Sequence, residues 1–334
     1  MNNPIAFGIK KNPIVFGGGQ TFTAPGGMDR GVAYTENGFF VCLYGYRSGL
    51  RGIAPGISFT QKAVGQISDW VKATFDAHDI KEMKRRPGEC TKLLWRPGID
   101  GRDQVLATLV PDVALMNEAG VSLSLLFSRF EEISLFIQPD ASNLDVYGHQ
   151  LRELLILACT EVESSLRAVF ASADSSMSSE SRLTTRDYYK LCEPLFLREY
   201  ELELRHYPHL PKCRPFYGWD ASKPTQSLPW YDAYNAVKHD RANMLHRATL
   251  RHCIEALAAA TAMYCAQFSI PSGIDWMHDA AFELNDWFKV ELINSDPATF
   301  YVPPVHVPLE RVAELWFFDG RNTGSWNPTA LNLA

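Results

Sequence analysis

The chain has 334 residues, of which 46% are hydrophobic and 21% charged, and its formal net charge is −6. This composition is typical of a folded globular protein of about two domains, and it excludes a chain that is disordered over most of its length. The negative net charge argues against a protein that coats nucleic acid without sequence preference.

The cysteines and the apolar runs bear on the location of the protein. Seven cysteines are scattered along the chain without a Cys-x-x-Cys pair, and the first residues show no basic segment followed by an apolar core. The longest apolar run, Ile254–Phe268, is interrupted by Glu255 and Gln267 and is too short to cross a bilayer. We therefore expect a cytoplasmic protein that does not interact with membranes.

The N-terminal part of the chain predicts extended structure. Residues 1–58 are rich in glycine and proline, with β-type runs such as Gly38–Tyr44 between them. They predict a small sheet, or an arm over the body of the protein. Residues 60–86 then predict an amphipathic helix, because apolar side chains recur there at helical spacing until Pro87-Gly88 ends the pattern.

The middle of the chain predicts a helical bundle. Residues 119–137 fit a helix or a strand, whereas residues 147–171 carry one broad apolar stripe of helical period. The members of that stripe are Leu151, Leu154, Leu155, Ala158, Cys159, Val162, Leu166 and Val169.

Shorter elements follow in the chain. Thr184 and Thr185 are suitable N-caps for a further helix, and Glu199–Arg205 alternates like a strand. Residues 207–229 are proline-rich and predict an irregular connection. From Trp230 a helix leads to an alanine-rich one that reaches Phe268, and the sequence leaves open whether these are one helix or two.

These elements predict an α+β protein that is mainly a helical bundle. We expect residues 1–144 to be a mixed region with an extended arm and one amphipathic helix, 145–270 to be the bundle, and 271–334 to be an extended or β segment. Because the flanking regions have few apolar residues for cores of their own, we expect them to pack on the bundle.

The segment Trp230–His246 concentrates side chains that carry chemistry. Imidazoles can move protons, and amide and cationic groups can hold phosphate oxygens. The polar members are Asp232, Asn235, Lys238, His239, Asp240, Arg241, Asn243 and His246.

The geometry of this segment depends on whether the helix is continuous. In one straight helix, Asp232, Asn235, His239, Asn243 and His246 share a stripe, and Arg241 points away from it. A break before Met244, with Asn243 as N-cap, would allow Arg241 and His246 to act together. In a dimer, the arginine of one copy could instead serve the histidine of the other.

A structural reading stands beside the functional one. Trp230, Tyr231 and Tyr234 are expected in the core, and Asn235 and His239 could be buried and hydrogen-bonded. Two carboxylates of the preceding helix, Glu161 and Glu163, could pair with Lys238 or Arg241, or be charges at its rim.

Two segments resemble those of bacterial HEPN-like helical-bundle proteins. Tyr147–Glu163 is similar to the helix with a Glu-x-Glu ending, and Trp230–Arg241 to the Tyr-Asn-x-x-Lys-His helix. HEPN ribonucleases carry an arginine followed four to six residues later by a histidine, and Arg241 and His246 fit that spacing. The usual polar residue after the arginine is Ala242 here, and the resemblance covers about residues 145–270.

The resemblance implies a bundle that cleaves RNA or binds nucleotides, often as a homodimer through the bundle face, of the kind found in toxins and phage-defence proteins. It implies metal-independent catalysis by Arg241 and His246, with Asn235, Lys238, His239 and Asn243 contacting substrate and Glu161, Glu163 and Asp240 supporting them. We expect no cofactor and no metal, since His206, His209 and Cys213 lack a fourth ligand. The alternatives are a noncatalytic module that binds a nucleotide or a partner protein, and a structural or assembly protein.

Overall fold

The computed structural model describes residues 3–10, 14–15, 21–22, 29–48, 51–59, 64–97, 113–173, 182–269, 284–305 and 324–333. The chain divides into two compact units. The sheet unit comprises residues 1–91, 96–108 and 296–329, and the helical unit comprises residues 92–95, 109–295 and 330–334. Both helices and sheets are present, so the predicted α+β class is confirmed.

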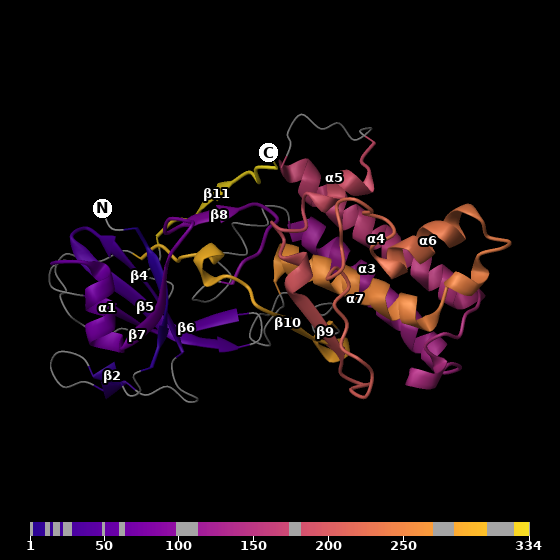
Figure 1. Ribbon diagram of the computed structural model, residues 1–334, viewed down its shortest axis with the longest axis horizontal. Helices are drawn as coiled ribbons and strands as arrows, with labels where there is room; N and C mark the ends of the chain where they lie inside the picture. The colour runs from indigo at the N-terminus through magenta and orange to yellow at the C-terminus, as the bar shows by residue number, and fades with distance from the viewer. Residues whose placement is uncertain are drawn as a thin grey trace. The chain divides into compact units, whose positions relative to one another are not determined.

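The sheet unit is built on a five-stranded antiparallel sheet in the order β6-β5-β4-β1-β7 (Figure 1). Its strands are β1 (Ile5–Ile9), β4 (Arg30–Glu36), β5 (Phe39–Ser48), β6 (Arg51–Phe59) and β7 (Ala77–Glu82). Two short strands, β2 (Ile14–Val15) and β3 (Thr21–Phe22), pair with each other. The extended structure expected for residues 1–58 is therefore largely this sheet.

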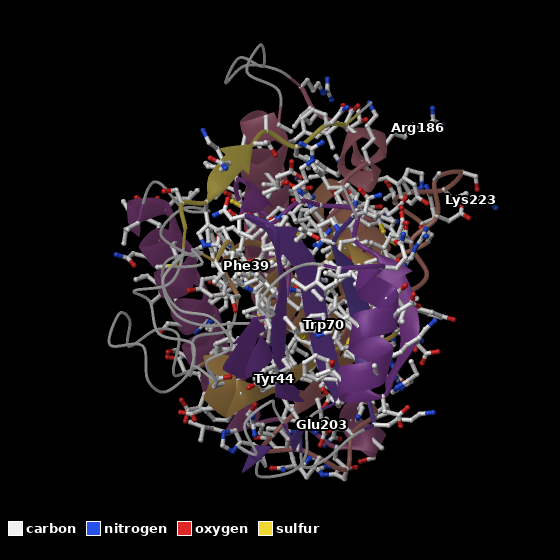
Figure 2. The ribbon with its side chains drawn as sticks, turned by 90° about the vertical axis from the view of Figure 1, so that its left-hand side faces the viewer. Phe39, Tyr44, Trp70, Arg186, Glu203 and Lys223 are labelled. Atoms are coloured by element: carbon white, nitrogen blue, oxygen red, sulfur yellow. The ribbon has the colours of Figure 1, made fainter. Side chains whose placement is uncertain are left out.

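One face of the sheet packs on helix α1 (Ile67–Phe75). Side chains alternate along a strand, so every second residue of β1, including Phe7, points to this face. The rings of Phe40 and Trp70 lie 5.5 Å apart, and those of Tyr44 and Phe75 lie 5.8 Å apart. Figure 2 looks toward this unit, with Trp70 and Tyr44 labelled. The expectation that the N-terminal region lacks a core of its own is wrong.

The helix expected over residues 60–86 is shorter than predicted. It ends at Phe75 because Asp76 takes the left-handed conformation, with φ of 51°. The chain then pairs with β1 as strand β7. Ile67, Val71 and Phe75 were correctly placed on a helix, whereas Val64 lies before it and is exposed. The residues after Asp76 form an edge strand whose partner lies far away in the sequence.

The other face of the sheet contacts the C-terminal part of the chain. Tyr34 of β4 donates its hydroxyl to the Pro303 oxygen (3.0 Å) and accepts from the Val305 amide (2.9 Å). Strand β8 (Glu89–Thr91) pairs in parallel with β11 (Asn327–Thr329). Residues 296–329 thus belong to the sheet unit, which differs from the expected division at residue 270. Residues 98–112, 270–283 and 306–323 lie outside the described part of the chain.

The helical unit contains α3 (Val113–Ser134), α4 (His149–Ala173), α5 (Thr185–Tyr189), α6 (Pro229–His239) and α7 (Leu250–Phe268) (Figure 1). Helix α7 is buried almost all round, which makes it the central helix. The predicted apolar stripe of α4 is buried at every position. The ambiguous residues 119–137 belong mostly to α3, whose buried side chains recur at helical spacing.

Short elements complete the helical unit. Strands β9 (Tyr200–Leu204) and β10 (Phe288–Leu292) form an antiparallel pair, and 3-10 turns occur at η1 (Ala141–Asn143), η2 (Leu197–Glu199) and η3 (Leu245–Arg247). A fourth turn, η4 (Pro297–Thr299), belongs to the sheet unit. The N-cap predicted at Thr184 is present as part of a capping box with Asp187, and β9 confirms the strand expected at 199–205. No helix of the described chain has the length and apolarity needed to cross a membrane.

Candidate functional site

The segment Trp230–Arg251 is two helices with a loop between them. Helix α6 ends at His239, because Asp240 leaves the helical conformation and its carboxylate accepts from the Asn243 amide (3.2 Å). Helix α7 begins at Leu250 with Thr249 as N-cap. The single stripe expected for a continuous helix therefore does not exist, and Asn243 does not cap a helix.

The loop of residues 240–249 is tied to both neighbouring helices. Arg247 pairs with Asp232 of α6 at 2.8 Å, and the Arg247 carbonyl oxygen lies 2.7 Å from Nδ1 of His252 in α7. The Leu250 amide donates to the Val146 oxygen at 2.9 Å, which holds the start of α7 beside the start of α4. The position of the loop is thus fixed by contacts on three sides.

The predicted catalytic residues lie on this loop and are exposed to solvent. Arg241 and His246 are both exposed, as is His239 at the end of α6. The Nδ1 atom of His246 lies 3.1 Å from the Asn243 carbonyl oxygen. The imidazoles are therefore not sealed in the core, and the alternative in which His239 is buried is wrong.

Arg241 lines an open groove of about 410 Å³ against one face of α4. Most of the groove consists of α4 side chains that are three, four, seven and eight positions apart, and these spacings place them on one helix face. The lining residues are His149, Gln150, Arg152, Glu153, Ile156, Leu157 and Arg241. His239 and His246 are not among them.

The charges in the groove are unbalanced. Among the described residues that line it, the one carboxylate belongs to Glu153, which pairs with Arg129 at 2.9 Å. Arg129 also pairs with Glu132 at 2.7 Å. The Nε atom of Arg152 is buried and has no hydrogen-bond partner in the described structure. The Arg241 side chain likewise makes no ion pair with any described residue. The groove therefore presents two guanidinium groups that lack a carboxylate partner.

Glu163 joins α4 to α6. It accepts from the hydroxyls of Tyr231 (2.6 Å) and Tyr234 (3.2 Å), and the Lys238 ammonium donates to the Tyr234 hydroxyl (2.7 Å). Burial, followed by the hydrogen bond to Glu163, raises the pKa of Tyr231 above its ordinary range. Glu163 thus hydrogen-bonds Tyr231 and Tyr234, and does not pair directly with Lys238 or Arg241 as was considered. The core positions predicted for Trp230, Tyr231 and Tyr234 are confirmed.

The other supporting residues have local roles. Asn235 donates to the Tyr231 carbonyl oxygen at 2.9 Å within α6. Hydrogen bonds from Asn243 hold the pKa of Asp240 below its usual value. Burial raises the pKa of Glu161, which also hydrogen-bonds Ser122 of α3, so Glu161 faces away from the loop. Of the predicted set, Arg241 alone enters the groove.

A metal site is not formed by the candidate ligands. His209 lies 3.2 Å from the Pro139 carbonyl oxygen, and Cys213 pairs through its backbone with Leu202. Within the described ranges, no group of three or more histidine, cysteine, aspartate or glutamate side chains is placed to hold a metal ion.

A larger cavity of about 620 Å³ lies in the sheet unit, beside His78 and the small residues Ala6 and Gly8 of β1. The cations that line it have carboxylate partners: Arg30 pairs with Asp29 at 3.1 Å, and Lys81 with Asp296 at 3.1 Å. None of the predicted site residues lines this cavity. The smaller groove is the better candidate for a binding site, because two of its arginines lack a carboxylate partner.

His149 and Arg152 are the groove residues that sequence reasoning missed. They stand one turn apart on the polar side of α4, opposite its apolar stripe. That spacing was visible in the sequence, but its relation to Arg241 depends on the fold. No family model, curated protein or solved structure matches this chain.

Proposed function

We propose that the protein is a metal-independent endoribonuclease of the HEPN-like type, with Arg241 and His246 as its catalytic residues. The observation that carries the proposal is the exposed loop of residues 240–249, which presents a guanidinium without a carboxylate partner and an accessible imidazole within six residues of each other. These two groups can stabilise phosphoryl charge and transfer protons at neutral pH.

The proposed reaction needs no group beyond the protein and the RNA. The ribose 2′-oxygen attacks the adjacent phosphorus and loses its proton to a neutral imidazole. The bond from phosphorus to the 5′-oxygen breaks, and that oxygen takes a proton from an imidazolium. The products are a 2′,3′-cyclic phosphate and a 5′-hydroxyl end. Arg241 would stabilise the charge that develops on the phosphoryl oxygens.

The hydrogen bonds in the structure change which of the other predicted residues is best placed to contact RNA. Asn235, Asn243 and Lys238 already have partners inside the protein, so binding RNA would compete with those bonds. His239 is exposed and makes no hydrogen bond or ion pair with a described side chain, and it is the better candidate for a substrate contact. A role in phage defence or as a toxin, and action as a homodimer or with a partner protein, remain part of this proposal.

The test is cleavage of end-labelled RNA by the full chain in the presence of EDTA. His246→Ala is compared with His209→Ala, a histidine that is also partly exposed but lies 3.2 Å from the Pro139 oxygen, away from the loop. We expect a loss of two orders of magnitude or more in His246→Ala only, roughly the contribution of general acid–base catalysis. Equal activity in both variants would remove His246 from the mechanism. No cleavage by the unmodified protein would overturn the proposal.

A second candidate is a noncatalytic module that binds a nucleotide or a partner protein. It is favoured by the structural hydrogen bonds of the polar cluster, since Glu163 and Lys238 hold tyrosines, and Asn235 and Asp240 bond within their own segment. This candidate predicts no cleavage, together with a rise in melting temperature when the nucleotide is added.

A further inference from the structure

We infer that the groove between α4 and Arg241 binds a phosphate group of single-stranded RNA, with Arg152 and Arg241 as the two cationic contacts. Neither Arg152 nor any other groove residue of α4 was assigned a role by the sequence. That the ligand is RNA rests on the proposed function, whereas the preference of the groove for a phosphate group rests on its own charges.

The first argument is the distribution of ion pairs around the groove. Two nearby arginines are neutralised, since Arg247 pairs with Asp232 and Arg251 with Asp145 at 3.2 Å. The groove's own carboxylate is held by Arg129. Arg152 and Arg241 are left without a carboxylate partner among the described residues. An anion is the ligand that balances such a pair.

The second argument is the state of the Arg152 side chain. Its Nε–H group is buried and has no acceptor in the described structure. A buried donor without an acceptor loses its hydration without compensation, and a turn of the side chain toward the groove would let a ligand oxygen restore the missing hydrogen bond. The planar guanidinium can offer two parallel donors to a phosphate, which a single point charge cannot do.

The third argument is the position of the groove at the start of a long helix. His149 is the first residue of α4, a helix of 25 residues. The first amides of a helix lack intrahelical acceptors, and the helix dipole places partial positive charge at this end. The Tyr147–Thr249 backbone bridge holds the start of α4 beside the start of α7, at the end of the loop that carries Arg241.

The walls and the size of the groove indicate a ligand that is larger than inorganic phosphate. Ile156 and Leu157 supply an apolar wall, and Leu157 is 48% exposed. A volume of about 410 Å³ exceeds what inorganic phosphate needs and is within the range of small-ligand sites. A ribose or an unpaired base can contact the apolar wall while its phosphate meets the arginines. The pattern favours single-stranded over paired RNA.

The test measures binding without cleavage. A fluorescent 2′-O-methyl oligouridine lacks the attacking hydroxyl, so its affinity is independent of catalysis. We expect Arg152→Gln and Arg241→Gln each to weaken binding about tenfold, the scale of one charge-assisted contact. The matched control is Arg186→Gln on α5, an exposed arginine that Figure 2 labels. Its affinity should change less than about twofold, as expected for a distant surface charge.

Further measurements secure the interpretation. Arg152→Lys keeps the charge and the alkyl stem, so a folded Lys variant with intermediate affinity separates charge from packing. Titration with inorganic phosphate should move the imidazole NMR resonances of His149 and leave those of His209 in place. A self-complementary duplex should bind more weakly than the single strand. Equal affinity of Arg152→Gln and Arg186→Gln would overturn the inference.

These experiments distinguish failure of the phosphate-binding groove from failure of the ribonuclease proposal. If His246→Ala abolishes cleavage but retains oligouridine affinity, and Arg152→Gln weakens that affinity, both proposals stand. If the unmodified protein never cleaves RNA and Arg152→Gln still loses affinity, the phosphate groove stands and the ribonuclease proposal falls. If cleavage occurs and the groove variants bind and cleave normally, the groove inference alone is wrong.

Discussion

The hydroxyl of Tyr231 lies 2.6 Å from a carboxylate oxygen of Glu163, and this hydrogen bond fastens α6 to α4. The same carboxylate accepts from Tyr234 at 3.2 Å, and Tyr234 accepts from Lys238. Helix α6 leads directly into the loop that carries Arg241. This bond therefore helps to fix the position of that loop relative to α4.

Loss of this bond should destabilise the helical unit. We expect Tyr231→Phe to lower the free energy of unfolding by about 1 to 3 kcal/mol, the range for a hydrogen bond to a charged group that is partly shielded from water. Urea unfolding measures the change. Glu131→Gln, at an exposed position of α3, should leave stability almost unchanged. A Tyr231→Phe protein as stable as the unmodified one would show that Glu163 is solvated or otherwise paired.

Glu255 should make the protein less stable as the pH rises. Burial raises its pKa from 4.5 to about 7, Arg251 opposes this shift, and one of its carboxylate oxygens is buried without a partner. Between these two values the folded state holds a proton that the unfolded state has released. Stability therefore decreases as the pH rises through this window and reaches its lower level above pH 7.

Glu255→Gln should remove this dependence. At pH 8 the variant should be more stable than the unmodified protein by roughly 2 to 3 kcal/mol, because a pKa difference of one unit corresponds to about 1.4 kcal/mol. At pH 4 the two proteins should be nearly equally stable. Melting temperatures across this range measure the difference. Parallel curves for the two proteins would contradict the assignment.

His252 should make the protein less stable as the pH falls, which is the opposite of the effect of Glu255. Burial lowers its pKa, and the two arginines Arg247 and Arg251 add to the effect. The unfolded state then binds the proton more readily than the folded state, so stability is complete above the ordinary histidine pKa and decreases on acidification. In His252→Asn the slope of stability against pH near this value should be smaller. An unchanged slope would exclude His252 as its source.

The glycine at position 8 makes room for the His78 ring on the neighbouring strand. A Cβ atom at Gly8 would lie 2.5 Å from two atoms of that ring. Gly8→Ala should therefore destabilise the sheet unit by about 1 kcal/mol or more. In a His78→Ala background the same change should cost little, which thermal unfolding of the four proteins can test.

The parts of the fold that were predictable are those determined by local pattern. The apolar stripe of α4 and the alternation of β9 lie within single segments, and both elements are present as expected. Strand β7 was predicted as helix because its pairing with β1 depends on residues far away in the sequence. The core of the sheet unit was missed for the same reason, since its apolar residues are dispersed among glycine-rich turns.

The candidate site was predictable only in its residue types. The sequence identified Arg241 and His246, but the break after His239 depends on the backbone of Asp240 and on the Thr249 cap. Arg152 carries no special signal on a polar helix face. Its relevance emerges only when Arg241, from a different element, lines the same groove.

The pairing of β8 with β11 has a consequence for synthesis of the chain. The strands of the five-stranded sheet all precede residue 83, whereas the segment that bonds to Tyr34 follows the helices of the helical unit in the sequence. During translation, one side of the nascent sheet must therefore wait, without its native cover, until residues 303–305 have left the ribosome. If the intervening helices fold first, the flexible loop between residues 91 and 296 becomes effectively shorter. The entropic cost of bringing residues 296–305 onto the sheet is then lower.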